Sequence, residues 1–440
     1  MAGDWQEEFR RKTVSAEEAV RVIKSGDRVS FTHGREPPTV TRAMVARKNE
    51  LKNVKVFMRT PSLDFPWYHE DWNDSFPLEI SYVRPIARNI MAERRVDFVP
   101  GSLIGITPQN PQVGDADVLL IELSPPDGQG FCSFGASVWG KKKAVQCAKI
   151  VIAEINQSFI HTFGDNAIHV SEIDYFVEQT TGRSSGVSEQ LGRKAPEIGP
   201  EEQSIAGYAG SLIQDGDTLQ IGVGSAAECL AQNGNLNNKT DLGWHSETTP
   251  RGIIPLVRNG VITGKRKTIN TGKLVAIALG GSEEDMKFVD RNPLFELYDS
   301  DYVLDPRVVS ANDRFVGINA AVAVDLTGQI AAESVGPAIL SGPGGQLTFA
   351  IGAQLSKGGR FITTLQSTAR GGKFSRIVPM LQEGSMITVP RTLADIVVTE
   401  FGIARLRGKT HRERALELIA VAHPDFRAEL KRQAGDMFWP

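Results

Sequence analysis

A chain of 440 residues is too long for one ordinary core, so we expect two or three domains of roughly 100–200 residues each. The 49 basic and 52 acidic residues leave a net charge of −3, which argues against a nucleic-acid partner and gives no reason for attraction to anionic lipid. Apolar residues make up 41% of the chain, enough for a large buried core.

The sequence also argues against metal, disulfide and membrane classes. The three cysteines, Cys132, Cys147 and Cys229, are few and widely spaced, unlike a disulfide framework or a zinc site. No H-x-x-x-H pair occurs, so we expect no metal site. The N-terminus lacks the apolar segment of a signal peptide, and no apolar run reaches the ~18 residues of a membrane helix. We therefore expect a cytoplasmic protein without a membrane anchor.

Helices and buried strands alternate through the first half of the chain. Ser15 is a candidate N-cap, with Glu18 three positions on as in a capping box. Short continuous aliphatic runs predict buried parallel strands. The expected elements are helices over 3–24 and 39–48 and strands within 26–34 and over 53–58, 117–122 and 148–155.

Two loops of this half are each open to more than one interpretation. The aromatic and acidic segment 67–74 is a binding loop, an oligomer contact or ordinary packing. The segment SPPDGQGFCSFG, Ser124 to Gly135, follows a predicted strand, and ligands of open α/β sheets gather at that edge. A plain turn explains the same residues.

The second half repeats the start of the first. VIKSGDRVSFTHG and LIQDGDTLQIGVG share an aliphatic pair, a Gly-Asp turn, a strand and a closing glycine. The turn glycines, Gly26 and Gly216, and the closing glycines, Gly34 and Gly224, are both 190 residues apart. Chance could give such a match, since Gly-Asp turns are common, but its gapless length favours duplication. We predict two related α/β domains, over 1–190 and 203–440, joined by a polar linker within 182–202.

The second domain reads as a further set of strands and helices. Its C-terminal part from Arg412 is amphipathic, with Pro424 at a helix start. The expected elements are helices over 203–214 and 253–259 and strands over 217–221, 274–279, 301–304, 315–324, 361–365 and 395–399.

Two glycine-rich loops in this domain can bring their backbone close to a ligand or to another segment of the chain. GVGSAAECLA, from Gly222, enters a helix and leaves backbone N–H groups free for a ligand. Ala227 and the lack of an acid ~20 residues on in a second strand disfavour a dinucleotide site. SGPGGQ, from Ser341 to Gln346, is a loop whose close neighbour is either a ligand or a strand.

Glu247 is a candidate catalytic carboxylate. DLGWHSETTPRG, Asp241 to Gly252, places Glu247 among small, hydroxyl-bearing and turn-forming residues. A lone carboxylate at a strand-to-loop junction is either a nucleophile or an ordinary loop anion. No G-x-S-x-G nucleophile elbow or Walker lysine motif competes with it.

Motifs along nearly the whole chain resemble those of the family I CoA-transferases, in the acetyl-CoA hydrolase/transferase branch that includes 4-hydroxybutyrate, butyrate and acetate CoA-transferases. The resemblance implies two open α/β domains with the active site at their interface. The motifs, in order, are EPP, SPPDGQGFCSFG, HVSEIDYFVE, GDTLQIGVGS, HSE, PLVRNGVITGKRK, GINAAVAVDLTGQIAAES, SGPGGQ, SKGG, SRIVP, VVTEFGIARLRGK and IAVAHPDF.

The resemblance also implies a chemistry and its residues. Glu247 would be the nucleophile that exchanges CoA between carboxylic acids through a glutamyl-CoA thioester. The Val223/Gly224 turn and Gly345 would supply the oxyanion donors. Coenzyme A would be a substrate, with no permanently bound cofactor, and the partners would be acyl-CoA and small carboxylic acids. The implied oxyanion and CoA-binding set is Gly222, Val223, Gly224, Ser225, Ala226, Gly344, Gly345, Asn319 and Arg370.

The chain departs from the family pattern beside the nucleophile. Thr248 to Arg251 replace the usual methionine and Ser-Asp pair, and SAAEC replaces AIPDA after the glycine turn. We hypothesise that Arg251, with Arg35 of the loop HGREPP, binds a second carboxylate, which would favour succinate or itaconate. A surface arginine is the alternative.

Three functions are consistent with these features. The first is an acyl-CoA:carboxylate CoA-transferase for short-chain acids such as 4-hydroxybutyrate, butyrate, acetate or a small dicarboxylate. The second is an acyl-CoA hydrolase, and the third is a non-catalytic CoA-ester sensor. The resemblance suggests a homodimer or homotetramer.

Overall fold

The computed structural model describes residues 5–101, 103, 116–180 and 198–439. The chain divides into two compact units, Met1–Lys194 with Ile277–Asp301, and Ala195–Ala276 with Tyr302–Pro440. The first unit thus takes in 277–301, which the predicted boundary assigned to the second domain. The predicted linker lies outside the described residues as far as 197.

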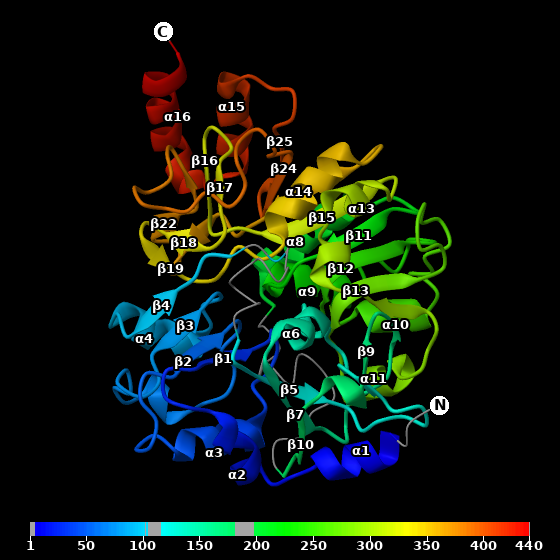
Figure 1. Ribbon diagram of the computed structural model, residues 1–440. Helices are drawn as coiled ribbons and strands as arrows, with labels where there is room; N and C mark the ends of the chain where they lie inside the picture. The colour runs from blue at the N-terminus through cyan, green and yellow to red at the C-terminus, as the bar shows by residue number, and fades with distance from the viewer. Residues whose placement is uncertain (1–4, 102, 104–115, 181–197, 440) are drawn as a thin grey trace. The chain divides into compact units, whose positions relative to one another are not determined.

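A parallel sheet forms the centre of the first unit. Its order is β10-β7-β5-β1-β2-β3-β4, and every pairing is parallel. Strands β1 to β4 run from blue to cyan in Figure 1. All six residues of β5 are buried, as its continuous aliphatic run predicts for a strand covered on both faces. The strands are β1 Arg28–Phe31, β2 Lys55–Met58, β3 Leu78–Ile80, β4 Val96–Phe98, β5 Val118–Leu123, β7 Ile150–Ile155 and β10 Tyr175–Glu178.

Short helices complete this unit. Ser15 caps α2, since its Oγ accepts a 3.1 Å hydrogen bond from Glu18 N, but the helix expected over 3–24 is broken into α1, α2 and a 3₁₀ turn. Trp67, Tyr68 and Trp72 are buried, so their cluster packs within the fold. The elements are α1 Trp5–Lys12, α2 Ala16–Ala19, η1 Val20–Val22, α3 Pro38–Ala46, η2 Pro66–Tyr68, η3 Pro85–Ala87, α4 Arg88–Ala92, β6 Phe131–Ser133, α6 Lys141–Cys147, β8 Phe163–Gly164, β9 Ala167–His169, η4 Val170–Glu172, α11 Glu283–Val289 and β14 Phe295–Leu297.

The second unit has its own sheet, in the order β25-β24-β20-β15-β11-β12. Its pairings are parallel except for the antiparallel pair β24 and β25. The strands are β11 Thr218–Ile221, β12 Gly243–Thr249, β15 Phe315–Ala320, β20 Arg360–Thr364, β24 Ile396–Thr399 and β25 Gly402–Arg405. Smaller strands are β16 Ala323–Asp325, β17 Ile330–Ala331, β18 Ser334–Val335, β19 Ala338–Ile339, β21 Thr368–Ala369, β22 Phe374–Ser375 and β23 Ile377–Val378, and β13 Leu274–Leu279 has the predicted bounds.

The helices near this sheet correct one strand prediction. Residues 301–304 do not form a strand, because helix α12 covers Ser300–Val303. A stretch of four residues is too short for its apolar pattern to separate helix from strand. The C-terminal helices α15 and α16 pack together, and Pro424 opens α16 as predicted. The remaining helices are α8 Pro200–Ser211, α9 Ser225–Gln232, α10 Ile253–Arg258, α13 Pro306–Ser310, α14 Gln346–Leu355, α15 His411–Val421 and α16 Pro424–Phe438.

The repeat found in the sequence is a repeat in the fold. The bounds of β1 and β11 differ by the same 190 residues as the glycines. Asp27 Oδ2 accepts from Lys24 N over 2.8 Å, and Asp217 Oδ2 accepts from Gln214 N over 2.7 Å, so both halves build the same turn before the strand. Each strand also lies next to the strand that follows it in the chain. The predicted fold class, two related open α/β domains, is therefore confirmed.

Two features are absent from the described residues. No helix there has both the length and the apolar character of a bilayer span. No group of three or more His, Cys, Asp and Glu side chains there could hold a metal ion.

Candidate active site

Glu247 lies near the end of β12, and its side chain is half-buried. The strand starts against β11 through Gly243 and Trp244. Gly243 must lack a side chain, because a Cβ there would come within 2.6 Å of Lys267 Cγ and 2.7 Å of Thr218 Oγ1. The tight start of the strand thus fixes the position of the carboxylate.

The loop that ends in Gly345 holds this carboxylate. Gly345 N donates a 2.6 Å hydrogen bond to Glu247 Oε2. Gly344 has a φ of +56°, a left-handed conformation that favours glycine. A Cβ on Gly345 would overlap Oε2 and would lie 2.5 Å from Leu304 Cδ2. The close neighbour of the SGPGGQ loop is therefore the Glu247 side chain.

His245, two residues before Glu247, is fully buried. Its Nε2 donates to the carbonyl oxygen of Val303 over 2.9 Å, and its Nδ1 has no hydrogen-bond partner among the described residues. Burial, reinforced by the nearby Lys267 ammonium, lowers the pKa of His245 to about 3. The imidazole is therefore neutral at physiological pH, and its direct contact is with backbone.

Comparison with known proteins identifies the family. Residues 2–182 match the model of the acetyl-CoA hydrolase/transferase N-terminal domain, and residues 281–434 match that of the C-terminal domain. The chain belongs to the acetyl-CoA hydrolase/transferase family. This membership confirms the predicted family and the prediction of an enzyme, a CoA-transferase.

Three relatives cover nearly the whole chain. 4-Hydroxybutyrate coenzyme A transferase of Clostridium kluyveri is 39% identical over 98% of this chain and 99% of its own. Succinyl-CoA:cyclohexane-1-carboxylate CoA transferase of Geobacter metallireducens is 36% identical over 98% of this chain and 97% of its own. The crystal structure of RipA from Yersinia pestis has a TM-score of 0.90 at 31% identity, covering 100% of both chains.

In this family member, the loop after β11 lies beside the amide pair of Gln220 and Asn319. The two side chains exchange hydrogen bonds of 2.8 and 3.2 Å. A Cβ on Gly222 would lie 2.7 Å from Asn319 Oδ1, so the strand end needs a glycine there. Ser225 Oγ donates to Glu202 Oε1 over 3.2 Å. The residues from Gly222 to Ala226 are all half-buried and precede or begin α9.

The three candidate arginines lie in different settings. Arg370 is exposed in the turn between β21 and β22, with its guanidinium 5.7 Å from the centre of the Phe374 ring. Arg251 is half-buried in the turn before α10. Arg35 Nη2 forms a 2.5 Å ion pair with Glu122, and the two side chains are only 5% and 4% exposed. Since Glu122 already holds the Arg35 guanidinium, we do not extend the carboxylate-binding hypothesis to Arg35.

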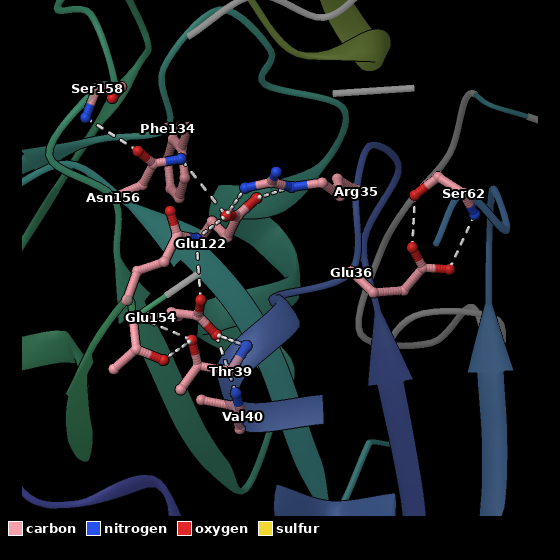
Figure 2. A network of polar contacts seen from close by, with 12 residues as sticks. Arg35, Glu36, Thr39, Val40, Ser62, Glu122, Phe134, Glu154, Asn156 and Ser158 are labelled. Atoms are coloured by element: carbon pink, nitrogen blue, oxygen red, sulfur yellow. Dashed lines mark hydrogen bonds and ion pairs between the residues drawn. The ribbon is translucent and has the colours of Figure 1, made fainter. Parts of the chain in front are cut away.

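Sequence reasoning missed a buried polar network around that ion pair (Figure 2). Glu122 and Glu154 lie opposite each other on β5 and β7, and Gln179 Nε2 donates to both, over 2.6 and 2.9 Å. Glu154 Oε2 also accepts from the backbone N of Thr39 and Val40, at the start of α3. The sequence did contain a sign of this network, because each of the two glutamates interrupts an otherwise aliphatic strand.

Proposed function

We propose that this protein is an acyl-CoA:carboxylate CoA-transferase that works by a ping-pong mechanism through a thioester on Glu247. The observation that carries the proposal is the 2.6 Å hydrogen bond from Gly345 N to the half-buried Glu247 carboxylate. A carboxylate held by a backbone donor, in a sequence without a G-x-S-x-G nucleophile elbow, suits repeated acyl transfer.

The proposed first half-reaction consumes acyl-CoA. A Glu247 oxygen attacks the thioester carbonyl, the C–S bond breaks, and a mixed anhydride and CoA thiolate form. The thiolate then attacks Cδ of Glu247, and the acyl group leaves as a carboxylate. In this second attack the negative charge develops on a glutamate oxygen, and the Gly345 N–H already lies 2.6 Å from Oε2. An incoming acid reverses both steps.

The Gly222–Ala226 segment, with Gly344, Asn319 and Arg370, is proposed to bind CoA and complete the set of oxyanion donors. Its support is that the segment is half-buried and runs into the first turn of helix α9, where backbone N–H groups have no acceptor within the helix. Closure of the site between the two domains stays a prediction of the family resemblance. Such closure would keep water from the thioester.

Trapping the thioester tests the mechanism. Mixing the protein with butyryl-CoA and reducing with borohydride should convert the Glu247 side chain to an alcohol, visible as a mass change in its peptide. Glu247→Ala should abolish both the label and CoA exchange, since no other group carries CoA. An unmodified Glu247 peptide beside measurable exchange would reject the mechanism.

A hydrolase on the same scaffold is the alternative, and the family description includes that activity. Water would then attack the glutamyl thioester. Steady CoA release from butyryl-CoA without any acceptor acid would favour hydrolysis. Release that requires an acceptor acid would favour transfer.

We further propose that Arg251 binds the second carboxylate of a dicarboxylate acid such as succinate or itaconate. Its support is the cation four residues after Glu247, and a relative named for succinyl-CoA. Arg251→Ala should lower kcat/KM at least tenfold for succinate and less than threefold for butyrate, because only succinate has a second charge to bind. Arg258→Ala, an exposed arginine of α10, is the control. Equal losses for both acids would reject the proposal.

A further inference from the structure

Glu202 joins the Gly222–Ala226 segment to two other parts of the second unit. This glutamate lies in the first turn of α8, and only 8% of the residue is exposed. Its Oε1 accepts hydrogen bonds from Ser225 Oγ over 3.2 Å and from Gln366 Nε2 over 2.7 Å. Its Oε2 accepts from Gly199 N over 3.0 Å, at the N-cap of the same helix. Both oxygens of this buried carboxylate are therefore hydrogen-bonded.

The donors reach Glu202 from three places in the chain. Ser225 is the first residue of α9, Gln366 lies two residues after β20, and Gly199 precedes α8. Helix α8 packs against both α9 and β20. Hydrogen bonds to a charged acceptor are roughly twice as strong as those between neutral groups. Glu202 thus holds the start of α9 against α8 and the loop after β20.

The start of α9 has no side-chain cap of its own. Its N-cap is Gly224, which has a φ of +150°, a conformation that residues with a side chain rarely adopt. A glycine-rich segment can take many backbone conformations, and fixing one of them costs conformational entropy. The bond from Ser225 Oγ to Glu202 is therefore a contact that fixes the start of α9 from outside the helix.

A cation lies near the same carboxylate, which allows a second interpretation. Burial lowers the pKa of Arg376, and the negative charges of Glu400 and Glu202 oppose this effect. Glu400 has its own donors, since its oxygens accept from Ser367 N over 2.9 Å and from Ser367 Oγ over 2.6 Å. Under this second interpretation Glu202 only balances the Arg376 charge. The two interpretations differ for glutamine, which has no charge but keeps an acceptor oxygen for Ser225 Oγ.

We propose that Glu202 is a positioning residue for coenzyme A, which holds the Gly222–Ala226 segment in its binding conformation through the Ser225 hydroxyl. It acts through Ser225 and takes no part in the bonds made and broken at Glu247. The inference rests on the proposed function, because that function assigns CoA to this segment.

Equilibrium binding of free CoA to the full-length protein tests this role, because no turnover occurs without an acyl group. Calorimetry should show CoA binding by the parent, at least fivefold weaker binding by Glu202→Ala, and binding within threefold of the parent by Glu202→Gln. Glu201→Ala is the matched control, since Glu201 is the exposed neighbour in the same helical turn. Its affinity for CoA should equal that of the parent.

A double-mutant cycle shows whether the effect passes through Ser225. Ser225→Ala should also weaken CoA binding. Adding Glu202→Ala to it should cause less than a threefold further loss, because the hydroxyl that needs the carboxylate is already absent. The proposal is overturned by no CoA binding to the parent, by a loss smaller than fivefold in Glu202→Ala, or by a further loss of threefold or more in the double variant. A loss in Glu202→Gln as large as that in Glu202→Ala would also overturn it, in favour of charge balance.

If Glu202→Ala does not fold, as judged by thermal unfolding, Glu202→Asp carries the same test with the same expectations. The shorter carboxylate keeps its charge near Arg376 and withdraws its oxygens from Ser225. Borohydride trapping from butyryl-CoA on the parent is measured in parallel. A Glu247 label in the parent, together with unaltered CoA binding by Glu202→Ala, would reject this inference alone, whereas the absence of that label would reject the proposed mechanism.

Discussion

At the scale of single residues, the site depends on a missing side chain. A methyl group at Gly345 would overlap Glu247 Oε2 and crowd Leu304. Gly345→Ala should therefore displace the carboxylate from its backbone donor and lower kcat by about 10²–10³, the loss typical of one oxyanion donor. Single-turnover labelling of Glu247 by butyryl-CoA measures this loss. Gly207→Ala in α8, where a methyl group meets open space, is the control, and equal rates for the two variants would contradict the prediction.

The sequence predicted some residues of the candidate site and could not reveal the surroundings of others. The HSE and SGPGGQ motifs led to Glu247 and Gly345 through family resemblance, and the structure joins them by one hydrogen bond. Arg35 was a hypothesised contact for a second carboxylate of the substrate, and the sequence could not show that its guanidinium is ion-paired in the structure. Its partner Glu122 is 87 residues away, and only the packing of strands reveals such a pairing.

At the scale of elements, His245 connects β12 to the loop that holds the carboxylate. Its hydrogen bond fixes Val303, the next residue Leu304 packs against Gly345, and Gly345 holds Glu247. We predict that His245→Leu lowers kcat 10- to 100-fold and leaves KM for acyl-CoA within threefold, because the imidazole positions the nucleophile without touching substrate. His245→Asn, which can still donate to the carbonyl, should recover part of the loss.

The pH profile separates this positioning role from acid–base catalysis. The pKa of His245 is about 3, so the imidazole does not change charge between pH 5 and 8. The Leu variant should keep the shape of the parent's kcat profile across that range. An unchanged kcat, or the loss of a limb near pH 6.5, would show that His245 has a different role.

Elements with strong local patterns were predicted well. The aliphatic runs of β5, β7 and β13 gave their strands to within two residues, because burial on both faces leaves a continuous apolar signature. The strand predicted over 301–304 was wrong because four residues fit the period of a helix as well as that of a strand. The long strand expected over 315–324 is divided into β15 and β16.

At the scale of the whole molecule, the buried glutamate pair makes stability depend on pH. Burial, with a contribution from Glu122, raises the pKa of Glu154 from 4.5 to about 7. The folded state therefore binds the proton more tightly than the unfolded state between these pH values. The free energy of unfolding should fall as pH rises from about 4.5 to 7, by on the order of 3 kcal/mol from this group.

Glu154→Gln should remove this slope, since an amide does not titrate. Urea unfolding at intervals between pH 4.5 and 7.5 measures it. Glu178→Gln, an exposed position on the adjacent strand β10, should leave the slope unchanged. If the parent and Glu154→Gln give parallel curves, another group sets the pH dependence.

One short sequence repeat was enough to predict two related α/β domains. It could not predict which segments of the chain belong to each unit. The Gly-Asp turns predicted related sheets because the same local chemistry makes the same turn twice. The return of 277–301 to the first unit has no local signature, because it depends on contacts between distant segments.

That shared turn has an evolutionary implication. After a domain is duplicated, selection can constrain the sequence of one copy while the sequence of the other copy diverges. Here the later copy bears Glu247, the nucleophile of the proposed mechanism. Chimaeras that exchange the earlier copy among relatives should therefore retain borohydride-trappable labelling at Glu247.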